Sequence, residues 1–380
     1  MIKSVTLKNF RGLTELTVPL ASITMLTGVN GAGKTSVLEG LYCLFSHSRL
    51  DVSPLSRYNK SLGFSFNQIM NQAANIPAGF TVRQNYNYKL FWDECPTFGN
   101  HECSVDAVSD NNYTWAWSYR KAGLSDLDTQ ITTNNPFPVD GSSEFALFNW
   151  HTRGKTINSK TKRVQNINEK FQRVQLLSQD GGLYLLPFEA KPMSICQYLD
   201  FASLRIQPQK LSFQTAKQLT AALDIINPNI TDVRLKDIVS GLSIILGDNI
   251  EVSLGTIGNG AVTWAGALIA IYEIVDLLKQ QPDKPAIILV DEMGAGIHYS
   301  IMLDIWKYLD DFNKQNRNLQ FVFSSHSDDC IRAFCETFSL RDDVSIVRLH
   351  QAATGGGTIP TEYRKESFQN ISDGEWEVRG

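Results

Sequence analysis

The chain has 380 residues, a length that buries enough surface to form a large core without disulfides or a structural metal. Its formal net charge of −4 excludes a protein that is basic overall, so any contact with nucleic acid must come from a local patch. The six cysteines are scattered along the chain, which favours a reduced, cytoplasmic protein.

Residues 1–50 predict strands followed by a helix. Apolar residues alternate with polar ones over residues 4–10 and 16–20, as in half-buried strands. Residues 22–28 predict a third strand that runs into a glycine-rich turn. Beyond the turn, apolar residues recur at helical spacing up to Phe45.

Residues 51–199 differ in composition, being rich in Asn, Ser, Thr and aromatic residues. The stretches VRQNYNYKLFW (82–92) and NYTWAWSYR (112–120) place aromatic residues at every second position, which predicts β-hairpins. We interpret these aromatic residues as hairpin packing rather than as platforms for stacking nucleic-acid bases. No heptad repeat is visible, so a coiled-coil arm is not expected.

From residue 200 onward, helix and strand patterns alternate, which predicts parallel strands in a sheet covered on both faces. KPAIILV (284–290) and LQFVFS (319–324) read as buried strands, and residues 302–312 as the helix between them. Residues 343–364 predict one or two closing strands. The longest apolar run, residues 261–275, contains Glu273, so we expect a buried helix and no membrane span.

The sequence GVNGAGKT, residues 28–35, fits the pattern G-x-x-x-x-G-K-[ST] between a predicted strand and a predicted helix. Backbone N–H groups of such a turn surround a phosphate, and the helix N-terminus adds partial positive charge. Lys34 would neutralise the outer phosphates, and the Thr35 hydroxyl would ligate Mg²⁺. A flexible turn before a helix is the alternative. The predicted nucleotide contacts are Asn30, Gly31, Gly33, Lys34, Thr35 and Ser36.

Two adjacent carboxylates, Asp291 and Glu292, follow the predicted strand that ends in AIILV. Groups at the carboxyl end of a parallel strand lie where such sheets bind ligands. Asp291 would hold Mg²⁺, whose charge offsets the cost of burying the carboxylate. Glu292 would be the general base that activates the attacking water. A solvated Asp-Glu turn is the alternative, and the upstream phosphate loop makes it the weaker one.

A histidine, His326, follows the next predicted strand in FVFSSHS. Alone, it could be a core or capping residue. Together with the other two motifs, it is predicted to hydrogen-bond the γ-phosphate and the attacking water. The predicted catalytic residues are therefore Lys34, Glu292 and His326, and the predicted metal ligands are Thr35 and Asp291.

The order of NFRGL, GVNGAGKTS, IGNGAV, ILVDEMGAGIH and FSSHS resembles the ABC-type ATPase heads of the SMC, RecF and OLD families, and especially the short OLD-like ATPases of bacterial defence operons. The resemblance implies an α/β P-loop NTPase of ABC-ATPase type, with a mixed sheet flanked by helices, an antiparallel β subdomain and a β-rich insertion. The implied division is an N-terminal part of the head (1–50), the insertion (51–199) and a C-terminal part of the head (200–380).

The resemblance also implies residue roles. Lys34 and Thr35 would be the Walker A residues, Asp291 and Glu292 the Walker B pair, and His326 the switch histidine. Arg11 in NFRG matches an arginine that reaches the nucleotide in such heads. Residues 295–298 would form the D-loop, which crosses to a second subunit.

A glycine-rich segment, Gly258, Asn259 and Gly260, stands where the ABC signature would bind the γ-phosphate of the opposite subunit. Gly258 occupies the position of the signature serine, and Val262 and Thr263 stand where many OLD-like relatives have an arginine. These departures predict that activation of one subunit's site by the other is weak or needs a partner. A glycine-rich turn before a core helix is the alternative.

Residues 153–173 contain many basic residues and a single acidic residue, Glu169. They could hold the phosphate backbone of DNA, dock an acidic partner or form a solvated loop, and the sequence leaves these three possibilities open. The basic residues are Arg153, Lys155, Lys160, Lys162, Arg163, Lys170 and Arg173.

The function that this resemblance implies is an ATPase that dimerises, or forms a higher homo-oligomer, around bound ATP and Mg²⁺. It further implies a cytoplasmic sensor or regulator in an anti-phage defence system that controls a separate nuclease or toxin effector, because no nuclease constellation is visible in this chain. A RecF-like ATPase that acts on DNA is the first alternative. A nucleotide-binding scaffold without turnover is the second.

Overall fold

The computed structural model describes residues 1–45, 102–110, 113–122, 144–157, 164–177, 183–185, 195–201, 213–237, 241–247, 249–280, 286–352, 357–374 and 377–378. The predicted β-hairpin residues 82–92, and all of the predicted insertion before residue 102, lie outside these ranges. So do Lys160, Lys162 and Arg163.

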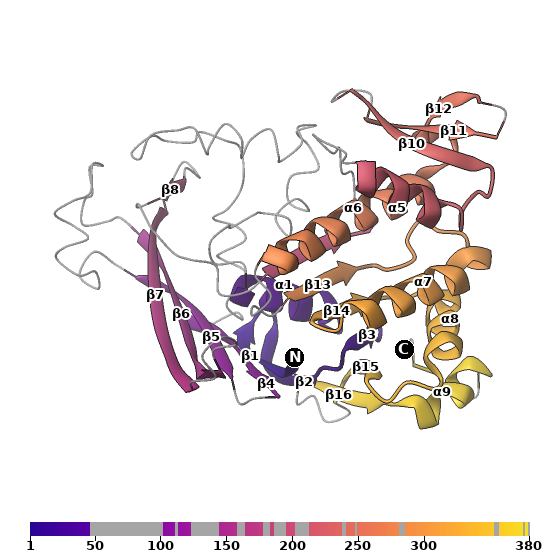
Figure 1. The fold of residues 1–380 in the computed structure, drawn as a ribbon. Coiled ribbons are helices and arrows are strands. Elements are labelled where there is room, and N and C mark those ends of the chain that lie inside the picture. The colour runs from indigo at the N-terminus through magenta and orange to yellow at the C-terminus, as the bar shows by residue number, and fades with distance from the viewer. Residues whose placement is uncertain are drawn as a thin grey trace.

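A six-stranded sheet in the order β16-β15-β3-β14-β13-β9 forms the centre of the molecule (Figure 1). Its strands run parallel except β16, which pairs antiparallel with β15 at one edge. The predicted buried strands and the two closing strands are therefore confirmed. The strands are β3 (Ile23–Thr27), β9 (Ile195–Asp200), β13 (Ala286–Asp291), β14 (Leu319–Ser324), β15 (Val344–Gln351) and β16 (Thr358–Tyr363).

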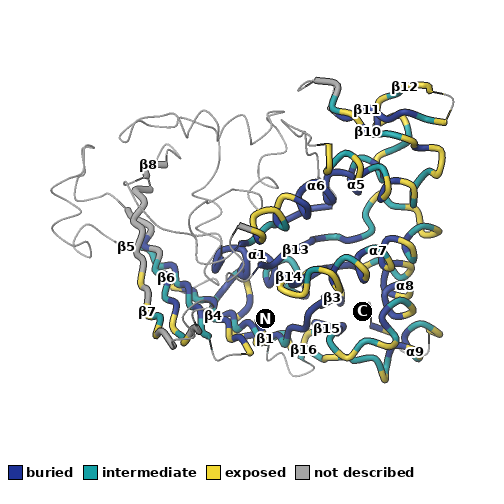
Figure 2. Tube along the Cα trace, in the orientation of Figure 1, coloured by how far each residue is buried: buried dark blue, intermediate teal, exposed yellow. Residues whose placement is uncertain are grey.

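Helices cover both faces of this sheet, which explains why β3, β13 and β14 are buried along their whole length (Figure 2). On one face, Ile288 and Val290 join a core made with α5, α6, α7 and α8. On the other face, Ile287 and Leu289 join a core made with α1. The helices are α1 (Lys34–Phe45), α5 (Phe213–Leu223), α6 (Asn259–Gln280), α7 (Met302–Gln315), α8 (Asp328–Phe338) and α9 (Lys365–Ser372).

A second, seven-stranded antiparallel sheet has the order β2-β1-β4-β5-β6-β7-β8. It joins the N-terminal hairpin to the strands of the predicted insertion, because β1 pairs directly with β4, for example Val5 opposite Ala107. The strands are β1 (Ile2–Phe10), β2 (Leu13–Pro19), β4 (Glu102–Ser109), β5 (Thr114–Ala122), β6 (Glu144–Ile157), β7 (Val164–Leu177) and β8 (Leu183–Leu185).

The two predicted limits of the insertion do not coincide with boundaries between the sheets. The expected end of the insertion at residue 199 falls inside β9, an edge strand of the central sheet that pairs with β13. The expected break at residue 50 separates strands that share one sheet. A three-stranded sheet of β10 (Ile230–Asp237), β11 (Gly241–Leu246) and β12 (Glu251–Ser253) was not predicted.

The alternating aromatic residues of β5 pack into the core, as predicted. Trp115 lies edge-on against Phe45 of α1, with ring centroids 5.5 Å apart. Trp117 lies edge-on against Phe10 of β1, at 6.0 Å. From β6, the indole of Trp150 donates a hydrogen bond to the carbonyl of Cys43 at 3.1 Å. These contacts fix α1, and with it the glycine-rich turn at its start, on the antiparallel sheet.

Among the described helices, the segment Asn259–Lys279 within α6 is long and apolar enough to cross a membrane. However, 72% of its most apolar 18-residue stretch is buried inside the protein. Its tryptophan, Trp264, is 1% exposed. The segment is therefore a core helix here, as the sequence predicted.

Candidate functional site

The glycine-rich turn joins β3 to α1 and adopts backbone conformations that favour glycine. Gly28 has φ 128° and Gly33 has φ 98°. A side chain at Gly28 would place its Cβ 2.2 Å from the carbonyl oxygen of Leu349 on β15. Only glycine fits there, so the turn packs closely against β15. Residues of the turn and the start of α1 line the same pocket.

Lys34 folds back over this turn. Its ammonium donates hydrogen bonds to the carbonyls of Gly28 at 2.6 Å and Val29 at 3.0 Å. Burial lowers the pKa of Lys34 below its ordinary value, and the nearby carboxylates of Asp291 and Glu292 oppose that shift. The ammonium is thus a partly desolvated cation held by two backbone carbonyls, and such a cation is a good partner for phosphate oxygens.

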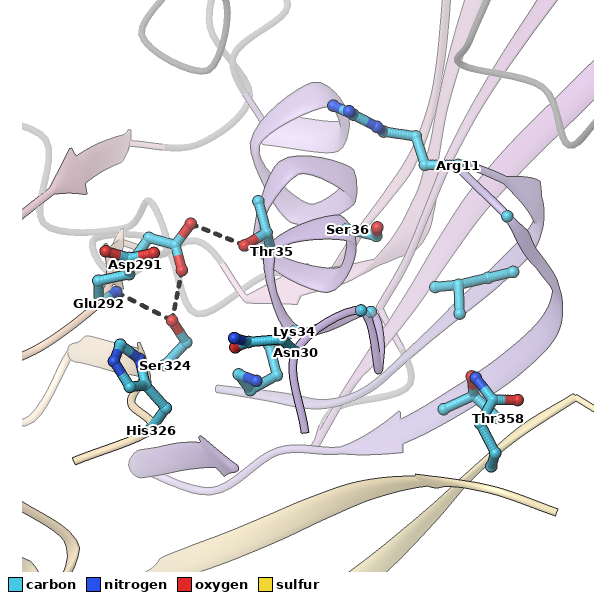
Figure 3. A pocket seen from close by; sticks show the side chains of 15 residues that line it. Arg11, Asn30, Lys34, Thr35, Ser36, Asp291, Glu292, Ser324, His326 and Thr358 are labelled. Carbon is cyan, nitrogen blue, oxygen red and sulfur yellow. Dashed lines mark hydrogen bonds between the residues drawn. The ribbon is translucent and has the colours of Figure 1, made fainter. Parts of the chain in front are cut away.

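Asp291 ends β13 and is 1% exposed. Its Oδ2 accepts hydrogen bonds from the hydroxyls of Thr35 at 2.9 Å and Tyr198 at 2.8 Å. Its Oδ1 accepts a short hydrogen bond from the hydroxyl of Ser324 (Figure 3). The buried carboxylate is therefore compensated by three hydroxyl donors, which also fix its orientation.

Glu292 has a left-handed backbone conformation, with φ 57°. This conformation costs a residue with a side chain about 1–2 kcal/mol, and glycine would adopt it freely. The N–H of Glu292 donates to the Ser324 hydroxyl at 3.0 Å, which helps to hold the turn. A strained position occupied by a carboxylic acid beside Asp291 points to a role for the side chain itself.

These residues line one pocket of about 420 Å³. It contains every predicted catalytic and metal-binding residue, and also Arg11 and the predicted contacts of the glycine-rich turn. The roles assigned to them remain predictions. The lining residues are Arg11, Gly12, Leu13, Asn30, Gly31, Gly33, Lys34, Thr35, Ser36, Asp291, Glu292, Ser324, His326, Gln351 and Thr358.

Arg11 and His326 lie at opposite ends of this pocket (Figure 3). His326 follows β14, lies beside Asp291 and Glu292, and is exposed. Arg11 has φ 46°, and its guanidinium pairs with Glu39 of α1, which is 1% exposed. In this structure the guanidinium is therefore held against α1, at the pocket wall.

The predicted signature residues Gly258, Asn259 and Gly260 do not line the pocket. They lie at the start of α6, where a Cβ on Gly260 would come 2.6 Å from the carbonyl oxygen of Gly296. The segment predicted to bind a partner's nucleotide therefore packs on the predicted D-loop of its own chain. The signature segment and the D-loop are therefore candidates for one surface that contacts a second copy of the chain.

Ser324 bonds directly to Asp291, and the serines around His326 in the sequence predict such a polar edge of the phosphate site. The sequence did not single out Tyr198, which also bonds directly to Asp291, or Gln351 and Thr358, which line the pocket at the start and end of the β15–β16 connection. Tyr198 has no signal in the sequence, since only the pairing of β9 with β13 brings it to Asp291.

The chain is similar to known ATPases in part of its sequence and in its fold. A family model described as an AAA ATPase domain matches residues 1–91, which contain the glycine-rich turn. No curated protein matches the chain.

Three solved structures are similar over nearly the whole chain. The SMC head domain from Thermotoga maritima is 12% identical with a TM-score of 0.41, covering 96% of this chain and 99% of that chain. A Smc head domain from Pyrococcus furiosus, bound to the C-terminal domain of ScpA, is 10% identical with a TM-score of 0.43, covering 98% and 99%. The recombination mediator protein RecF-ATPrS is 10% identical with a TM-score of 0.39, covering 95% and 98%. At these identities and scores, the assignment of the fold rests on the strand topology of the chain itself.

The fold is that of a P-loop ATPase of the ABC type, as predicted. Its phosphate-binding turn lies between β3 and α1, and its acidic pair lies at the end of β13, two strands away in the sheet. The carboxyl ends of these parallel strands meet at one edge, so the pocket forms where this class of sheet binds its ligand.

The pocket residues fit a magnesium ion. Thr35 Oγ1 and Asp291 Oδ2 are 2.9 Å apart at the start of α1, and both offer the oxygen ligands that Mg²⁺ prefers. Mg²⁺ usually takes one or two protein oxygens and completes its shell with water and substrate phosphates. When Mg²⁺ is bound, the Thr35 oxygen would face the metal, and Tyr198 and Ser324 would remain as the donors to Asp291.

We therefore expect Tyr198→Phe to lower the affinity of the site for Mg²⁺. The change keeps the ring but removes a hydrogen bond to a charged group, worth about 1–2 kcal/mol, so the Mg²⁺ concentration for half-maximal ATP hydrolysis should rise about fivefold to thirtyfold. Nucleotide binding without metal should change little. A magnesium titration of phosphate release measures this effect. Tyr272→Phe, which removes a tyrosine hydroxyl paired with Tyr308 outside the pocket, is the control. An unchanged magnesium midpoint would argue against the role of Tyr198.

Proposed function

We propose that this chain binds ATP with Mg²⁺ in the pocket at the start of α1 and hydrolyses it to ADP and phosphate. The observation that carries the proposal is the bond between Thr35 and Asp291, with Lys34 on one side of it and Glu292 on the other. Phosphoryl transfer to water requires a phosphate-binding turn, a pair of oxygens that bind Mg²⁺ and a second carboxylate, here Glu292, that accepts a proton from the water.

In this proposal, each residue has a distinct task. The N–H groups of residues 30–35 and the ammonium of Lys34 bind and orient the β- and γ-phosphates. Thr35 and Asp291 would hold Mg²⁺, which neutralises charge that develops on the phosphate oxygens. Glu292 accepts a proton from the attacking water, and His326 donates a hydrogen bond to the transferring group.

We infer further that two copies of the chain complete each other's sites. The signature residues Gly258, Asn259 and Gly260 are absent from the pocket of their own chain and pack on the predicted D-loop. The residue after the D-loop, Tyr299, is 64% exposed, and its ring lies tilted against that of His298 with the ring centroids 4.4 Å apart. Exposed aromatic residues next to a glycine-rich helix start suit a contact that closes over ATP.

The test is phosphate release from ATP, measured with and without Mg²⁺ and over a range of protein concentrations. A site completed by a second copy should show specific activity that rises with protein concentration, and light scattering should show dimers with ATP and monomers without it. Nucleotide binding without release above background would instead favour the scaffold function. Release at constant specific activity would refute the shared site but leave the hydrolysis intact.

The finer assignment is to an OLD-like ATPase of an anti-phage defence system, such as the ATPase of the PARIS system, acting on a separate nuclease or toxin effector. It rests on the motif resemblance alone and stays a prediction. A RecF-like ATPase that binds DNA is the competing function, and the basic strands of the antiparallel sheet favour testing it directly.

A further inference from the structure

A row of cations follows one face of the hairpin β6–β7, on the far side of the sheet from α1. Trp150 and Thr152 of β6 point inward and are buried, so the alternate positions point outward. His151, Arg153 and Lys155 occupy those outward positions. Across the hairpin, Lys170 stands opposite His151. Arg120 of β5 belongs to the same face. We call Arg120, His151, Arg153, Lys155 and Lys170 the basic face.

Three cations of the basic face are exposed and have no acidic partner among the described residues. Arg153, Lys155 and Lys170 are exposed, and none of them forms an ion pair with a described residue. The outward positions of β5, β6 and β7 carry no acidic residue. Acids stand on this face of the sheet on β4, at Glu102 opposite Arg120 and at Asp106, and on β2, where Glu15 pairs with Lys8 of β1. A cluster of one sign on a chain of net charge −4 creates a local positive potential.

Neutral hydrogen-bonding side chains lie between the cations. Asn168 stands opposite Arg153, and Asn166 stands opposite Lys155. The imidazole of His151 is hydrogen-bonded to the Asn168 side chain at 2.7 Å. Amide, imidazole, ammonium and guanidinium groups are the usual partners of phosphate oxygens in nucleic acids.

The face lacks the features of a protein interface. Its outward positions from Thr114 to Ser118 and from Asn149 to Lys155 contain no large aliphatic residue and no Phe, Tyr or Trp, and Leu147, which stands opposite Arg120, is buried. Stable protein interfaces have an apolar centre with aromatic anchors, whereas nucleic-acid interfaces are polar and positively charged. The same lack of aromatic residues disfavours single strands, whose bases stack on such side chains.

The shape of the hairpin suits a double helix. β6 and β7 each have 14 residues, and a strand of this length spans about 46 Å. Residues 154–157 and 164–167 extend beyond β5 as a two-stranded ribbon, since β5 pairs only as far as Arg153. The major groove of B-form DNA admits a two-stranded ribbon, whereas that of an RNA duplex is too deep and narrow. β7 lies at the outer side of the sheet in Figure 1.

We propose that the basic face is a docking surface for the phosphate backbone of duplex DNA, independent of sequence. The register of β5, β6 and β7 gathers cations separated by amides on one face, and of these cations only Arg120 has a described acid, Glu102, directly opposite it. This inference goes beyond the proposed hydrolysis, because the face is on the opposite side of the antiparallel sheet from α1.

The experiment measures binding of a fluorescent 30-bp DNA duplex of random sequence by anisotropy, without nucleotide, between 50 and 200 mM KCl. The variant is Arg153→Gln/Lys155→Gln/Lys170→Gln. Each lost phosphate contact lowers the slope of log affinity against log salt by about 0.9, so the slope should fall by up to about 3. Affinity at 100 mM salt should fall at least tenfold. A single strand and an RNA duplex should compete less well than DNA duplex.

The matched control is Lys217→Gln/Lys307→Gln/Arg317→Gln, which makes the same change of charge on α5, on α7 and just after α7. It should bind DNA as the wild type does, and both triple variants should keep the wild-type melting temperature and ATPase rate. The proposal is overturned if the wild type shows no salt-dependent duplex binding, or if the two triple variants bind equally well. It is also overturned if poly-L-glutamate displaces the duplex more readily than unlabelled duplex does, because the occupant would then be an acidic protein. A failure here with intact ATPase activity leaves the proposed hydrolysis standing.

Discussion

Glu292→Gln is expected to bind ATP with wild-type affinity and to hydrolyse it about 10²- to 10⁴-fold more slowly, the usual contribution of a positioned general base. Glutamine keeps the size of the side chain and the hydrogen bond from the backbone N–H to Ser324, so the strained turn should survive. What is lost is the group that accepts the proton of the attacking water. Single-turnover phosphate release and equilibrium nucleotide binding separate the two effects.

The same variant should accumulate a nucleotide-bound dimer or larger assembly, because the closed state would no longer be released by hydrolysis. Light scattering with ATP and Mg²⁺ measures this accumulation. Glu336→Gln, on the exposed surface of α8, removes a carboxylate outside the pocket and should behave as the wild type does. A Glu292→Gln protein that remains monomeric with ATP would contradict the dimer. One that turns over at the wild-type rate would contradict the assignment of the base.

Lys34→Ala is expected to lose at least about 100-fold in ATP affinity. The ammonium contributes charge-assisted hydrogen bonds to the phosphates, worth about 3 kcal/mol, and each 1.4 kcal/mol is a factor of about ten. Because Lys34 lies within a turn whose shape is set by its glycines, the fold should persist. Isothermal titration with ATP and Mg²⁺ measures the affinity, and a melting curve checks the fold.

The control for Lys34→Ala is Lys307→Ala, which removes an exposed ammonium from α7. Binding of ATP by Lys34→Ala at the strength of the control would refute the placement of the phosphates at the start of α1. Loss of affinity together with a large fall in melting temperature would show that the lysine acts mainly through the loop, by its bonds to Gly28 and Val29.

Local rules explain why much of this pocket was predictable. A turn that needs positive φ at Gly28 and Gly33 restricts which residues it can contain, so the phosphate loop can be recognised from its sequence motif. Strands buried on both faces, such as β13, appear as continuous aliphatic runs, and Asp291 marks the end of that run. The helical stripe of α7 is legible for the same reason, since Ile305, Trp306 and Leu309 are all buried.

Other features depend on which strands pair, and no local pattern encodes that. Tyr198 supports Asp291 only because β9 lies beside β13 in parallel register, 93 residues apart in sequence. The predicted insertion continues the N-terminal hairpin because β4 pairs with β1. The basic face also needs the register of β6 with β7, which places Lys170 beside His151 and Arg153 opposite Asn168.

The sequence by itself therefore determined the phosphate loop, the acidic pair, the buried strands and the helices between them, because backbone conformation and burial act on neighbouring residues. Only the tertiary structure decided which hydroxyls hold Asp291, where the antiparallel sheet begins and which cations share a face. Those features arise from pairing between distant strands, and a shift of register by one residue would turn every side chain of a strand to the opposite face.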